Sequence, residues 1–527
     1  MLRSLNKLVY PVTLLLALTL TACGGGGSGG STTPVKPTPP PPTKADLSAL
    51  TLSEGSLSPS FQAATENYTS SVGLPVGSIT VTPTAVETDA TITVNGADVI
   101  TGIASAAIPL VEGANTVTVV VTHPDLVKTY TLAVTRLSAS AFAEQARKSG
   151  AGVKQVAIDE NTLAVGSPST NTVTIYFNDG SGAWLPQQLI TASNADASDE
   201  FGNSVSLTGN TLIVGAPGED SSAKGINGDG TNNDANGSGA AYIFTRSGAI
   251  WTQQAYLKAS NTRENTTFGG RVLVSGDTAI VGSVGEKNTG ENGDQFGNFV
   301  SNSGAAYVFN RTGGSWTQTN YLKASNIVAS KFGRDIAIAG DTMAISAFQE
   351  DNNTGAVYIF TRPGGSTAWS QQARLTASNA ETGDLFGISL DLDGNTLAVG
   401  AFDDSVNNDP TDNQANAAGA VYVFTGSGSS WTQQAYLKSA TPEIDGQFGI
   451  SIGLLGDDLT VGAQGEEANA GTVHFFTRSG SAWSQQSPIK PSIIAAGNKF
   501  GSSLSYASNG NLAVAAKNEG IVYIFQQ

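Results

Sequence analysis

The stretch WTQQAYLKAS at residues 251–260 returns almost unchanged as WTQQAYLKSA at residues 431–440. Six tryptophans begin segments of this kind, and the chain has no others: Trp184, Trp251, Trp316, Trp369, Trp431 and Trp483. All six segments run on to a Phe-Gly pair, then to a strand like TLAVG and a strand like GAVYVF. A repeat of this size that contains only strands predicts an all-β architecture closed on itself.

The repeat extends from about residue 140 to residue 527. TLAVG-like strands are expected at 162–166, 211–215, 278–282, 342–346, 396–400, 458–462 and 511–515, and GAVYVF-like strands at 172–177, 239–244, 304–309, 355–360, 419–424, 471–476 and 520–525. In the GAVYVF strand, Val421 and Val423 face one side of the sheet, and Tyr422 and Phe424 face the other. Both faces are apolar and need cover, which sheets stacked around an axis provide. We expect the Phe-Gly strand innermost and the Trp strand outermost.

These residues resemble FG-GAP repeats, the units of the integrin-α-type seven-bladed β-propeller. LIVGAP at 212–217 is the best copy of the GAP element, and Phe-Gly pairs open six units, at Phe201, Phe268, Phe332, Phe386, Phe448 and Phe500. The match is closest to a bacterial secreted branch, in which Trp-x-Gln-Gln follows each GAVYVF strand. The resemblance implies a seven-bladed β-propeller over residues 140–527.

The last unit ends at Gln527, after GIVYIF at 520–525, and so lacks a Trp-type strand of its own. FAEQARK at 142–148 is similar to WSQQARL at 369–375. We therefore predict that this early strand completes the last blade and leaves no raw sheet edge.

Residues 1–22 are predicted to be a targeting segment, with Arg3 and Lys7 before an apolar run from Val9 to Leu20. The tetrapeptide Leu20-Thr21-Ala22-Cys23 resembles the bacterial lipoprotein signal. It implies lipid attachment at Cys23, the only cysteine; the alternative is an ordinary secretion signal. Gly24 replaces the Asp associated with inner-membrane retention, so we expect lipid anchoring at the outer membrane or cell surface. Residues 23–44 are a Gly/Pro-rich tether.

Residues 45–136 alternate like short strands, with an Asn-Gly hairpin turn at 95–96, and predict a β-sandwich. LSALTLSEGSLSPSF at 47–61, TITVNG at 91–96 and YTLAVTR at 130–136 resemble the cadherin-like β-sandwich family of bacterial surface proteins. That resemblance implies a spacer or adhesion module without catalytic residues.

Composition and the histidines restrict the function. Lys+Arg 26 against Asp+Glu 43 gives a net charge of −17, which argues against a nucleic-acid partner. His123 lies in a predicted turn of the sandwich, and His474 replaces the tyrosine of a GAVYVF strand, where we expect it in the core or at its edge. Because no Ser/His/Asp or Cys/His set can be assembled, we expect no enzyme. A polysaccharide-active enzyme with a carboxylate pair stays an alternative.

Calcium is a possible cofactor. The DxDxDG loop common in integrin-type repeats is absent, because tight turns such as LTGNTL at 207–212 join the first two strands. Another loop motif recurs three times, at Asn227-Gly228-Asp229, Asn292-Gly293-Asp294 and Asn407-Asn408-Asp409. Their oxygens suit Ca²⁺, and Asp220, Asp234, Asp403 and Asp404 of the same loops could add ligands. The alternative is turn chemistry alone.

The function that these features favour is binding or adhesion, to a protein or a glycan, through propeller loops of a lipid-anchored surface protein. A structural role in assembly of the cell envelope is the first alternative, and the polysaccharide-active enzyme is the second.

Overall fold

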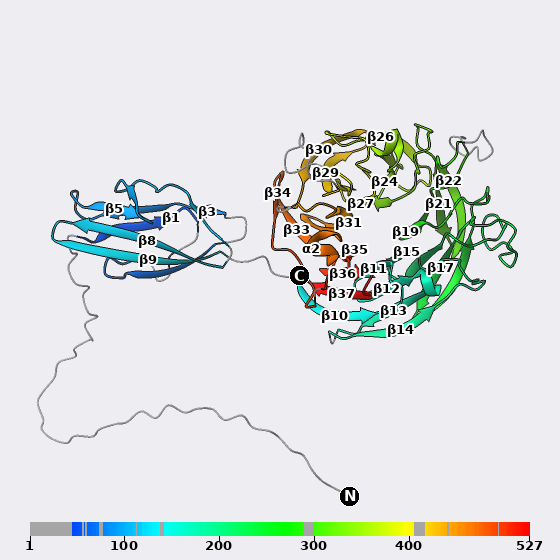
Figure 1. Ribbon diagram of the computed structural model, residues 1–527, viewed down its shortest axis with the longest axis horizontal. Helices are drawn as coiled ribbons and strands as arrows, with labels where there is room; N and C mark the ends of the chain where they lie inside the picture. The colour runs from blue at the N-terminus through cyan, green and yellow to red at the C-terminus, as the bar shows by residue number, and fades with distance from the viewer. Residues whose placement is uncertain are drawn as a thin grey trace, which may run out of the picture. The chain divides into compact units, whose positions relative to one another are not determined.

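A computed structural model describes residues 45–527, except 55–56, 58–60, 73–76, 112, 137–141, 181, 289–299, 405–416, 440–441 and 494. The chain folds into two compact units, of which the larger holds residues Arg136–Gln527 (Figure 1). Strands dominate both units, so the expected all-β class is confirmed.

The smaller unit is built from antiparallel strands. They are β1 (Leu47–Leu52), β2 (Asn67–Val72), β3 (Ser78–Ile79), β4 (Val81–Ala85), β5 (Thr91–Val94), β6 (Ala97–Val99), β7 (Ile108–Pro109), β8 (Gly113–His123) and β9 (Leu126–Arg136). One sheet has the order β2-β9-β8-β5-β6, and β1-β4 and β3-β7 form pairs. Alternate residues of β8 and β9 fill the core, among them Val119 and Leu132. Asn95 and Gly96 both have positive φ, as the predicted hairpin turn requires.

In the larger unit the described residues form seven four-stranded antiparallel sheets. The first four are β11 (Gln155–Asp159), β12 (Thr162–Ser167), β13 (Thr172–Asn178), β14 (Trp184–Ile190); β15 (Ser204–Thr208), β16 (Thr211–Ala216), β17 (Ala240–Ser247), β18 (Ile250–Leu257); β19 (Arg271–Ser275), β20 (Thr278–Ser283), β21 (Ala305–Thr312), β22 (Ser315–Leu322); and β23 (Ile336–Ala339), β24 (Thr342–Ala347), β25 (Ala356–Thr361), β26 (Ser370–Leu375).

The other three are β27 (Ser389–Asp393), β28 (Thr396–Ala401), β29 (Ala420–Ser427), β30 (Ser430–Leu437); β31 (Phe448–Leu455), β32 (Asp458–Ala463), β33 (Thr472–Ser479), β34 (Ala482–Gln485); and β10 (Ala143–Ser149), β37 (Ile521–Gln526), β36 (Asn511–Ala516), β35 (Phe500–Tyr506). Single turns interrupt three loops: the 3₁₀ turn η1 (Pro168–Thr170), α1 (Glu350–Asn353) and α2 (Glu466–Asn469).

Each sheet is covered on both faces by its neighbours. Tyr422 and Phe424 of β29 belong to a core cluster with Phe386, whereas Val421 and Val423 belong to the next cluster, with Phe448. The predicted two-faced burial of the GAVYVF strand is therefore confirmed.

The sheets stand in a ring, with the first strand of each repeat innermost and the Trp strand outermost (Figure 1). Each inner strand contacts that of the next sheet, and β35 contacts β11, so the packing runs all the way round. β10 pairs with β37, from Ala143 opposite Gln526 to Ser149 opposite Ile521. The prediction that residues 142–148 complete the last sheet is confirmed.

Two motif glycines meet between neighbouring repeats. A Cβ on Gly215, in the GAP element, would lie 1.9 Å from the carbonyl oxygen of Gly269, in the next Phe-Gly pair. Gly269 itself has a φ of +92°, a conformation that glycine adopts without steric cost. The glycines of the two motifs thus allow the backbones of neighbouring sheets to approach closely.

The Trp-x-Gln-Gln motif links the outer strands. Trp316 Nε1 donates to Gln254 Oε1 of the preceding sheet at 2.8 Å, and Trp483 Nε1 donates to Gln434 Oε1 at 2.9 Å. The guanidinium of Arg311 lies 5.2 Å from the ring centre of Trp316. Trp251 Nε1 makes the same contact with Gln187 Oε1, so in these three repeats the motif joins a sheet to the one before it.

Candidate functional site

A cavity of about 690 Å³ lies among the inner strands of the larger unit. In the first repeat, Gly152-Val153 stands where the others have Phe-Gly. The two positions after this pair supply lining residues in all seven repeats: Lys154 and Gln155, Asn203, Gly270 and Arg271, Arg334 and Asp335, Ile388 and Ser389, Ile450 and Ser451, Ser502 and Ser503. These positions gather because every inner strand begins there, at the same end of the ring.

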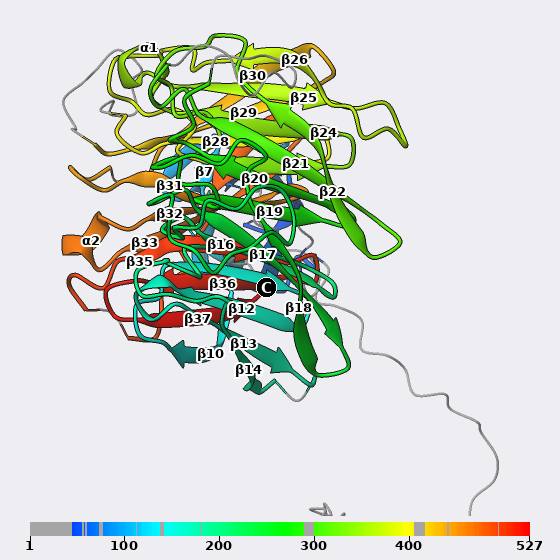
Figure 2. The ribbon, with the colours of Figure 1, turned by 90° about the vertical axis from the view of Figure 1, so that its right-hand side faces the viewer.

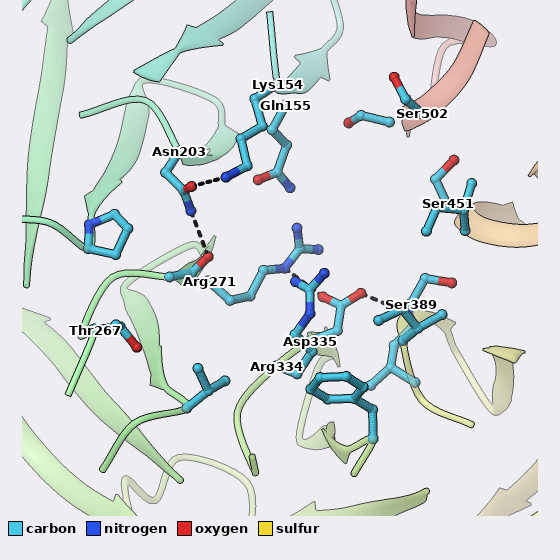
Figure 3. A pocket seen from close by; sticks show the side chains of 18 of the residues that line it. Lys154, Gln155, Asn203, Thr267, Arg271, Arg334, Asp335, Ser389, Ser451 and Ser502 are labelled. Carbon is cyan, nitrogen blue, oxygen red and sulfur yellow. Dashed lines mark hydrogen bonds and ion pairs between the residues drawn. The ribbon is translucent and has the colours of Figure 1, made fainter. Parts of the chain in front are cut away.

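The cavity is rich in cations although the whole chain carries a net charge of −17. Lys154, Arg271, Lys331, Arg334 and Lys517 line it, against the carboxylates of Glu200 and Asp335. In Figure 3, Lys154, Arg271 and Arg334 point inward from one side, and Ser389, Ser451 and Ser502 lie across from them. A fixed group of cations in a recess attracts anions.

Asp335 is already occupied by partners of its own. Its Oδ2 accepts a hydrogen bond from Leu390 N at 2.9 Å, and its Oδ1 accepts one from Ile336 N at 2.8 Å. Arg271 Nε lies 2.5 Å from the same Oδ1. Asp335 thus joins β23 to β27 and neutralises Arg271.

Four cations of the cavity have no carboxylate partner of this kind. Within the described residues, no carboxylate forms an ion pair with Lys154, Lys331, Arg334 or Lys517, although Lys154 Nζ donates to Asn203 Oδ1. Lys331 Nζ and the guanidinium carbon of Arg334 each lie 5.8 Å from the ring centre of Phe348. The aromatic face partly compensates these charges, but it leaves the hydrogen-bond donors of Arg334 without an acceptor ion.

The pKa values show how crowded these charges are. Burial lowers the pKa of Arg334, and Arg271 lowers it further, against the effect of Asp335. Burial also lowers the pKa of Lys154, with Arg334 acting in the same direction and Glu200 opposing. For Lys517, burial and then Lys499 and Lys154 lower the pKa. An anion in the cavity would relieve this repulsion.

The residue before each motif phenylalanine holds a left-handed backbone, as in Thr267 (φ +53°) and Lys331 (φ +53°). This conformation is costly for a β-branched residue such as threonine. Hydrogen bonds fix it, since Thr267 N donates to Gly237 O at 3.0 Å and Lys331 N donates to Asn302 O at 2.8 Å. Because the conformation recurs in six repeats, it belongs to the fold, and it places variable side chains at the cavity.

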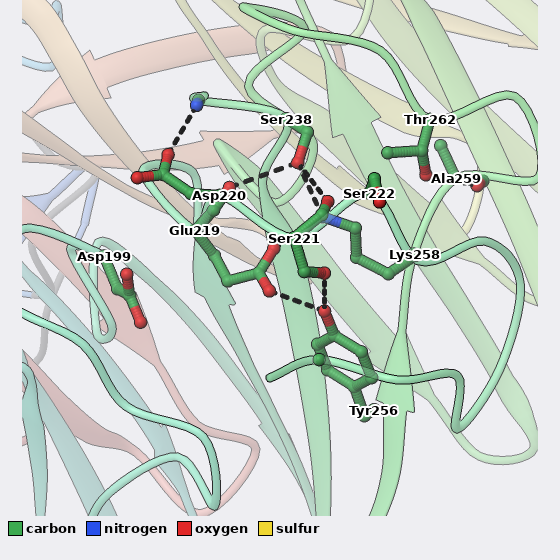
Figure 4. A network of polar contacts seen from close by, with 12 residues as sticks. Asp199, Glu219, Asp220, Ser221, Ser222, Ser238, Tyr256, Lys258, Ala259 and Thr262 are labelled. Carbon is green, nitrogen blue, oxygen red and sulfur yellow. Dashed lines mark hydrogen bonds and ion pairs between the residues drawn. The ribbon is translucent and has the colours of Figure 1, made fainter. Parts of the chain in front are cut away.

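Near this end of the ring, the loops between second and third strands are fastened by buried ion pairs. Glu219, four residues after the GAP glycine, pairs with Lys258 Nζ at 2.5 Å (Figure 4). Tyr256 Oη donates to Glu219 Oε1 at 2.6 Å. The same arrangement recurs in Glu286–Lys323 (3.0 Å) and Asp404–Lys438 (2.8 Å). Both members of every pair are buried, so these groups hold the loops.

In two other repeats a different side chain contacts this carboxylate. Arg374 Nη2 lies 2.7 Å from Glu350 Oε1, and His474 Nε2 lies 2.8 Å from Glu466 Oε2. His474 is 4% exposed, and its ring occupies the place of the strand's usual tyrosine, so its predicted core role is confirmed. His123, 3.4 Å from Asp89, belongs to the smaller unit.

At the first of the three loops with candidate calcium ligands, the side chains serve the turn. Asn227 Oδ1 accepts a hydrogen bond from Tyr256 N at 2.9 Å. Asp229 Oδ1 accepts from Thr231 Oγ1 at 2.6 Å and Thr231 N at 3.0 Å, which lowers the pKa of Asp229. Asp220 Oδ1 accepts from Gly237 N, and Asp404 is paired with Lys438.

Several candidate residues lie outside the part of the chain that the structure describes: Cys23, Asn292, Asp294, Asn407 and Asp409. Among the described residues, no three His, Cys, Asp or Glu side chains are grouped to hold a metal ion. Calcium binding by these loops therefore stays a prediction.

The cationic lining was not foreseen from the sequence. A signal for it exists, because the two positions after each Phe-Gly pair vary while their surroundings repeat. Compared across the repeats, these positions bring Lys154, Arg271 and Arg334 together. Lys517, which follows a GAP-like element, completes the set.

Comparisons with known proteins agree with this architecture. Residues 47–137 match the family model of the cadherin-like beta sandwich domain. Residues 184–244, 251–309, 316–360 and 369–424 match the FG-GAP repeat. The chain thus contains a cadherin-like β-sandwich followed by FG-GAP repeats.

A protein of Evansella cellulosilytica named "Putative membrane protein" is 40% identical over 106 residues, which cover 20% of this chain and 16% of that protein. Among solved structures, the chain aligns with the mitotic checkpoint complex at 13% identity and a TM-score of 0.46, over 74% of this chain and 96% of that one. It aligns with Saccharomyces cerevisiae Sqt1 at 10% identity and a TM-score of 0.38, over 73% and 99%. No helix in the described residues is long and apolar enough to span a membrane.

Proposed function

We propose that this chain, with a cadherin-like β-sandwich domain before its FG-GAP repeats, is a lipid-anchored, non-enzymatic surface protein that binds a protein or a glycan. Its binding element is one face of a seven-bladed β-propeller. The observation that carries the proposal is the cationic cavity at the start of the inner strands.

The seven-bladed architecture is supported by the ring of four-stranded sheets and by β10, which supplies the outer strand of the last one. Figure 2 shows α1 and α2, which lie in loops between second and third strands, on one side of the ring, and the tip of the β21–β22 hairpin on the other. Loops gathered on one face of a rigid scaffold are where binding usually resides.

Binding fits the lining of the cavity better than catalysis does. Lys154, Arg271 and Arg334 can hold an anion, but a general base needs to lie within hydrogen-bond reach of the group it activates. Asp335 is engaged by two backbone amides and Arg271. Ser389 Oγ donates to Gly449 O at 2.7 Å, and Ser451 Oγ donates to Gly501 O at 2.7 Å, so these hydroxyls tie neighbouring sheets together.

Protein and glycan arrays probed with the full chain, in calcium and in chelator, test this proposal. We expect specific binding of a ligand class to the wild type and loss of that binding in Arg334→Gln or in loop variants of the same face. Absence of any ligand from both arrays would favour the envelope-assembly role, and turnover of a bound polysaccharide would favour the enzyme.

A further inference from the structure

We propose that the cavity among the inner strands binds an acidic sugar residue of a glycan, with its carboxylate or sulfate group at Arg334, Lys154 and Lys517. This inference rests on the proposed binding function and names its ligand class.

The first step of the argument is the imbalance of charge. Five cations line the cavity and two carboxylates oppose them, one of which, Asp335, is saturated by Arg271 and backbone amides. Arg334 is exposed to the cavity, and its planar donors suit a carboxylate or a sulfate. The net negative charge of the protein repels an acidic ligand at long range. Such a ligand can bind only where cations are concentrated locally, as they are in this cavity.

The second step is the shape and polarity of the space. A volume of about 690 Å³ far exceeds the roughly 30 Å³ that one water occupies in the liquid, so an inorganic ion alone would not fill it. Phe348, Ile388 and Ile450 give the lining apolar parts. A sugar ring presents apolar C–H faces as well as hydroxyl groups, and it suits a lining that combines cations, amides and apolar surface.

The third step is a set of unsatisfied polar atoms beside the cavity. Thr267 Oγ1 and Gln464 Oε1 belong to lining residues, are buried, and have no hydrogen-bond partner within the described part of the chain. Buried polar atoms without partners are rare in folded proteins and call for an explanation. Sugar hydroxyls that enter the cavity, directly or through water, would provide partners.

A purely structural role explains Arg271, whose ion pair with Asp335 helps to join β19 to β23. It does not explain Arg334 or Lys517, which form no ion pair with described residues. Burial lowers the pKa values of both groups, and neighbouring cations act in the same direction. A desolvated charge without an ion-pair partner reduces stability and persists where function requires it.

Calorimetric titration of the full chain with glucuronic acid, glucose 6-sulfate, glucose, inorganic sulfate and N-acetylglutamate tests the proposal. We expect at least one acidic sugar to bind, and glucose to bind at least tenfold more weakly because it lacks the charge-assisted hydrogen bonds. Binding should weaken in about 0.5 M salt, because mobile ions then screen the attraction between the cations and the acidic group over a few ångströms.

Arg334→Gln should weaken binding of the acidic sugar at least tenfold, since it removes a charged donor. Arg334→Lys should restore part of it. Arg147→Gln, at an exposed side chain of the outer strand β10 and outside the cavity lining, makes the same change in net charge and should leave binding unchanged. Arg334→Gln should keep or raise the melting temperature, because it removes a desolvated charge that has no ion-pair partner, so that loss of binding is separable from loss of folding.

The outcomes are distinct. If a glycan binds on the array and Arg334→Gln leaves that binding unaltered, this inference is wrong and the proposed function still holds. Equal binding of glucose, or tighter binding of N-acetylglutamate or inorganic sulfate than of both acidic sugars, would overturn the acidic-sugar assignment. Failure of every sugar here and of every ligand on the arrays would overturn both.

Discussion

At the scale of single residues, the buried carboxylates of the loops each keep a nitrogen partner, although the identity of that partner changes between repeats. Glu219 is paired with Lys258, Glu350 with Arg374 from a different position of the outer strand, and Glu466 with His474 from the neighbouring strand. Each of these carboxylates belongs to a residue of the loop between the second and third strands of its sheet. Removing only the cation would leave a buried charge without its partner.

We therefore expect Lys258→Met to lower the free energy of unfolding by about 3–5 kcal/mol, because Glu219 loses its ion pair. The double variant Lys258→Met with Glu219→Gln should recover part of the loss. Denaturant unfolding measures both, with Lys224→Met, at an exposed lysine, as control. Equal stability of Lys258→Met and wild type would contradict the assignment of this pair.

Asp199 provides a pH-dependent prediction. Burial, with help from Glu219, raises its pKa to about 6 from the usual 3.8, so the folded state holds the proton more tightly than the unfolded one. The cost of ionising the folded protein therefore grows as the pH rises from about 4 and is fully present above about 6. Asp199→Asn should stabilise the protein at pH 8, on the order of 2–3 kcal/mol, and not at pH 4.

Melting temperatures of wild type and Asp199→Asn across pH 4 to 8 measure this difference. The amide oxygen of Asn can still accept the hydrogen bond from Asp196 N, which Asp199 Oδ2 accepts at 2.8 Å. Asp234→Asn, at an exposed aspartate, should leave the melting temperature unchanged. A difference in melting temperature between the two proteins that does not depend on pH would show that ionisation of Asp199 does not control the effect.

The sequence predicted the residues of the core better than those of the cavity. Alternation of Val421, Tyr422, Val423 and Phe424 specifies which faces are buried, because strand geometry is local. The partners of Glu219 and Arg334 depend on strands brought together by the fold, so no local pattern around them reveals their pairing. Only comparison of equivalent positions across repeats places Lys154 beside Arg334.

At the scale of elements, β10 closes the ring. It covers the edge of β37, and Phe142 before it packs against Phe475 with ring centres 5.2 Å apart. Glu144 Oε2 accepts a hydrogen bond from Ser492 N at 2.7 Å. Without this strand, the hydrogen-bonding groups of β37 would form an open sheet edge.

Deletion of residues 142–149 should therefore lower the melting temperature of the whole repeat unit and promote aggregation. A synthetic peptide of the same residues added in excess should restore part of the stability, since the edge can pair again. Gln145→Ala, at an exposed side chain of β10, is the control. Thermal unfolding unchanged by the deletion would exclude a closing role for β10.

The loops between second and third strands supply a further prediction. Should Asp229, Asp294 and Asp409 bind Ca²⁺, a hundredfold excess over the dissociation constant would stabilise the fold by roughly 2.7 kcal/mol. Asp229 would then exchange its hydrogen bonds from Thr231 for the ion. Melting curves in millimolar calcium and in chelator measure the effect. Coincident curves, without calorimetric heat, leave only the turn role.

At the scale of the whole molecule, composition and site carry opposite charges. The net charge of −17 predicts an acidic outer surface and gives no hint of a cationic recess. Net charge averages over the chain, whereas the ring brings a few positions from distant repeats to one place. The cationic cavity favours a ligand whose anionic group can enter it. The acidic outer surface repels acidic polymers and so limits their unspecific binding elsewhere.

The anchor is the last prediction. Cys23 is the only cysteine and follows a Leu-Thr-Ala sequence typical of lipoprotein signals, and the Gly/Pro-rich residues after it suit a tether. Several acyl chains on one residue hold a protein at a membrane far more firmly than a single chain does. Cys23→Ser should therefore release the protein from the membrane fraction, while Gly24→Asp should keep it lipidated and move it to the inner membrane. Fractionation of cells that express each variant measures both outcomes. Because neither substitution touches the folded units, ligand binding should persist in both, and membrane association that survives Cys23→Ser would rule out this anchor.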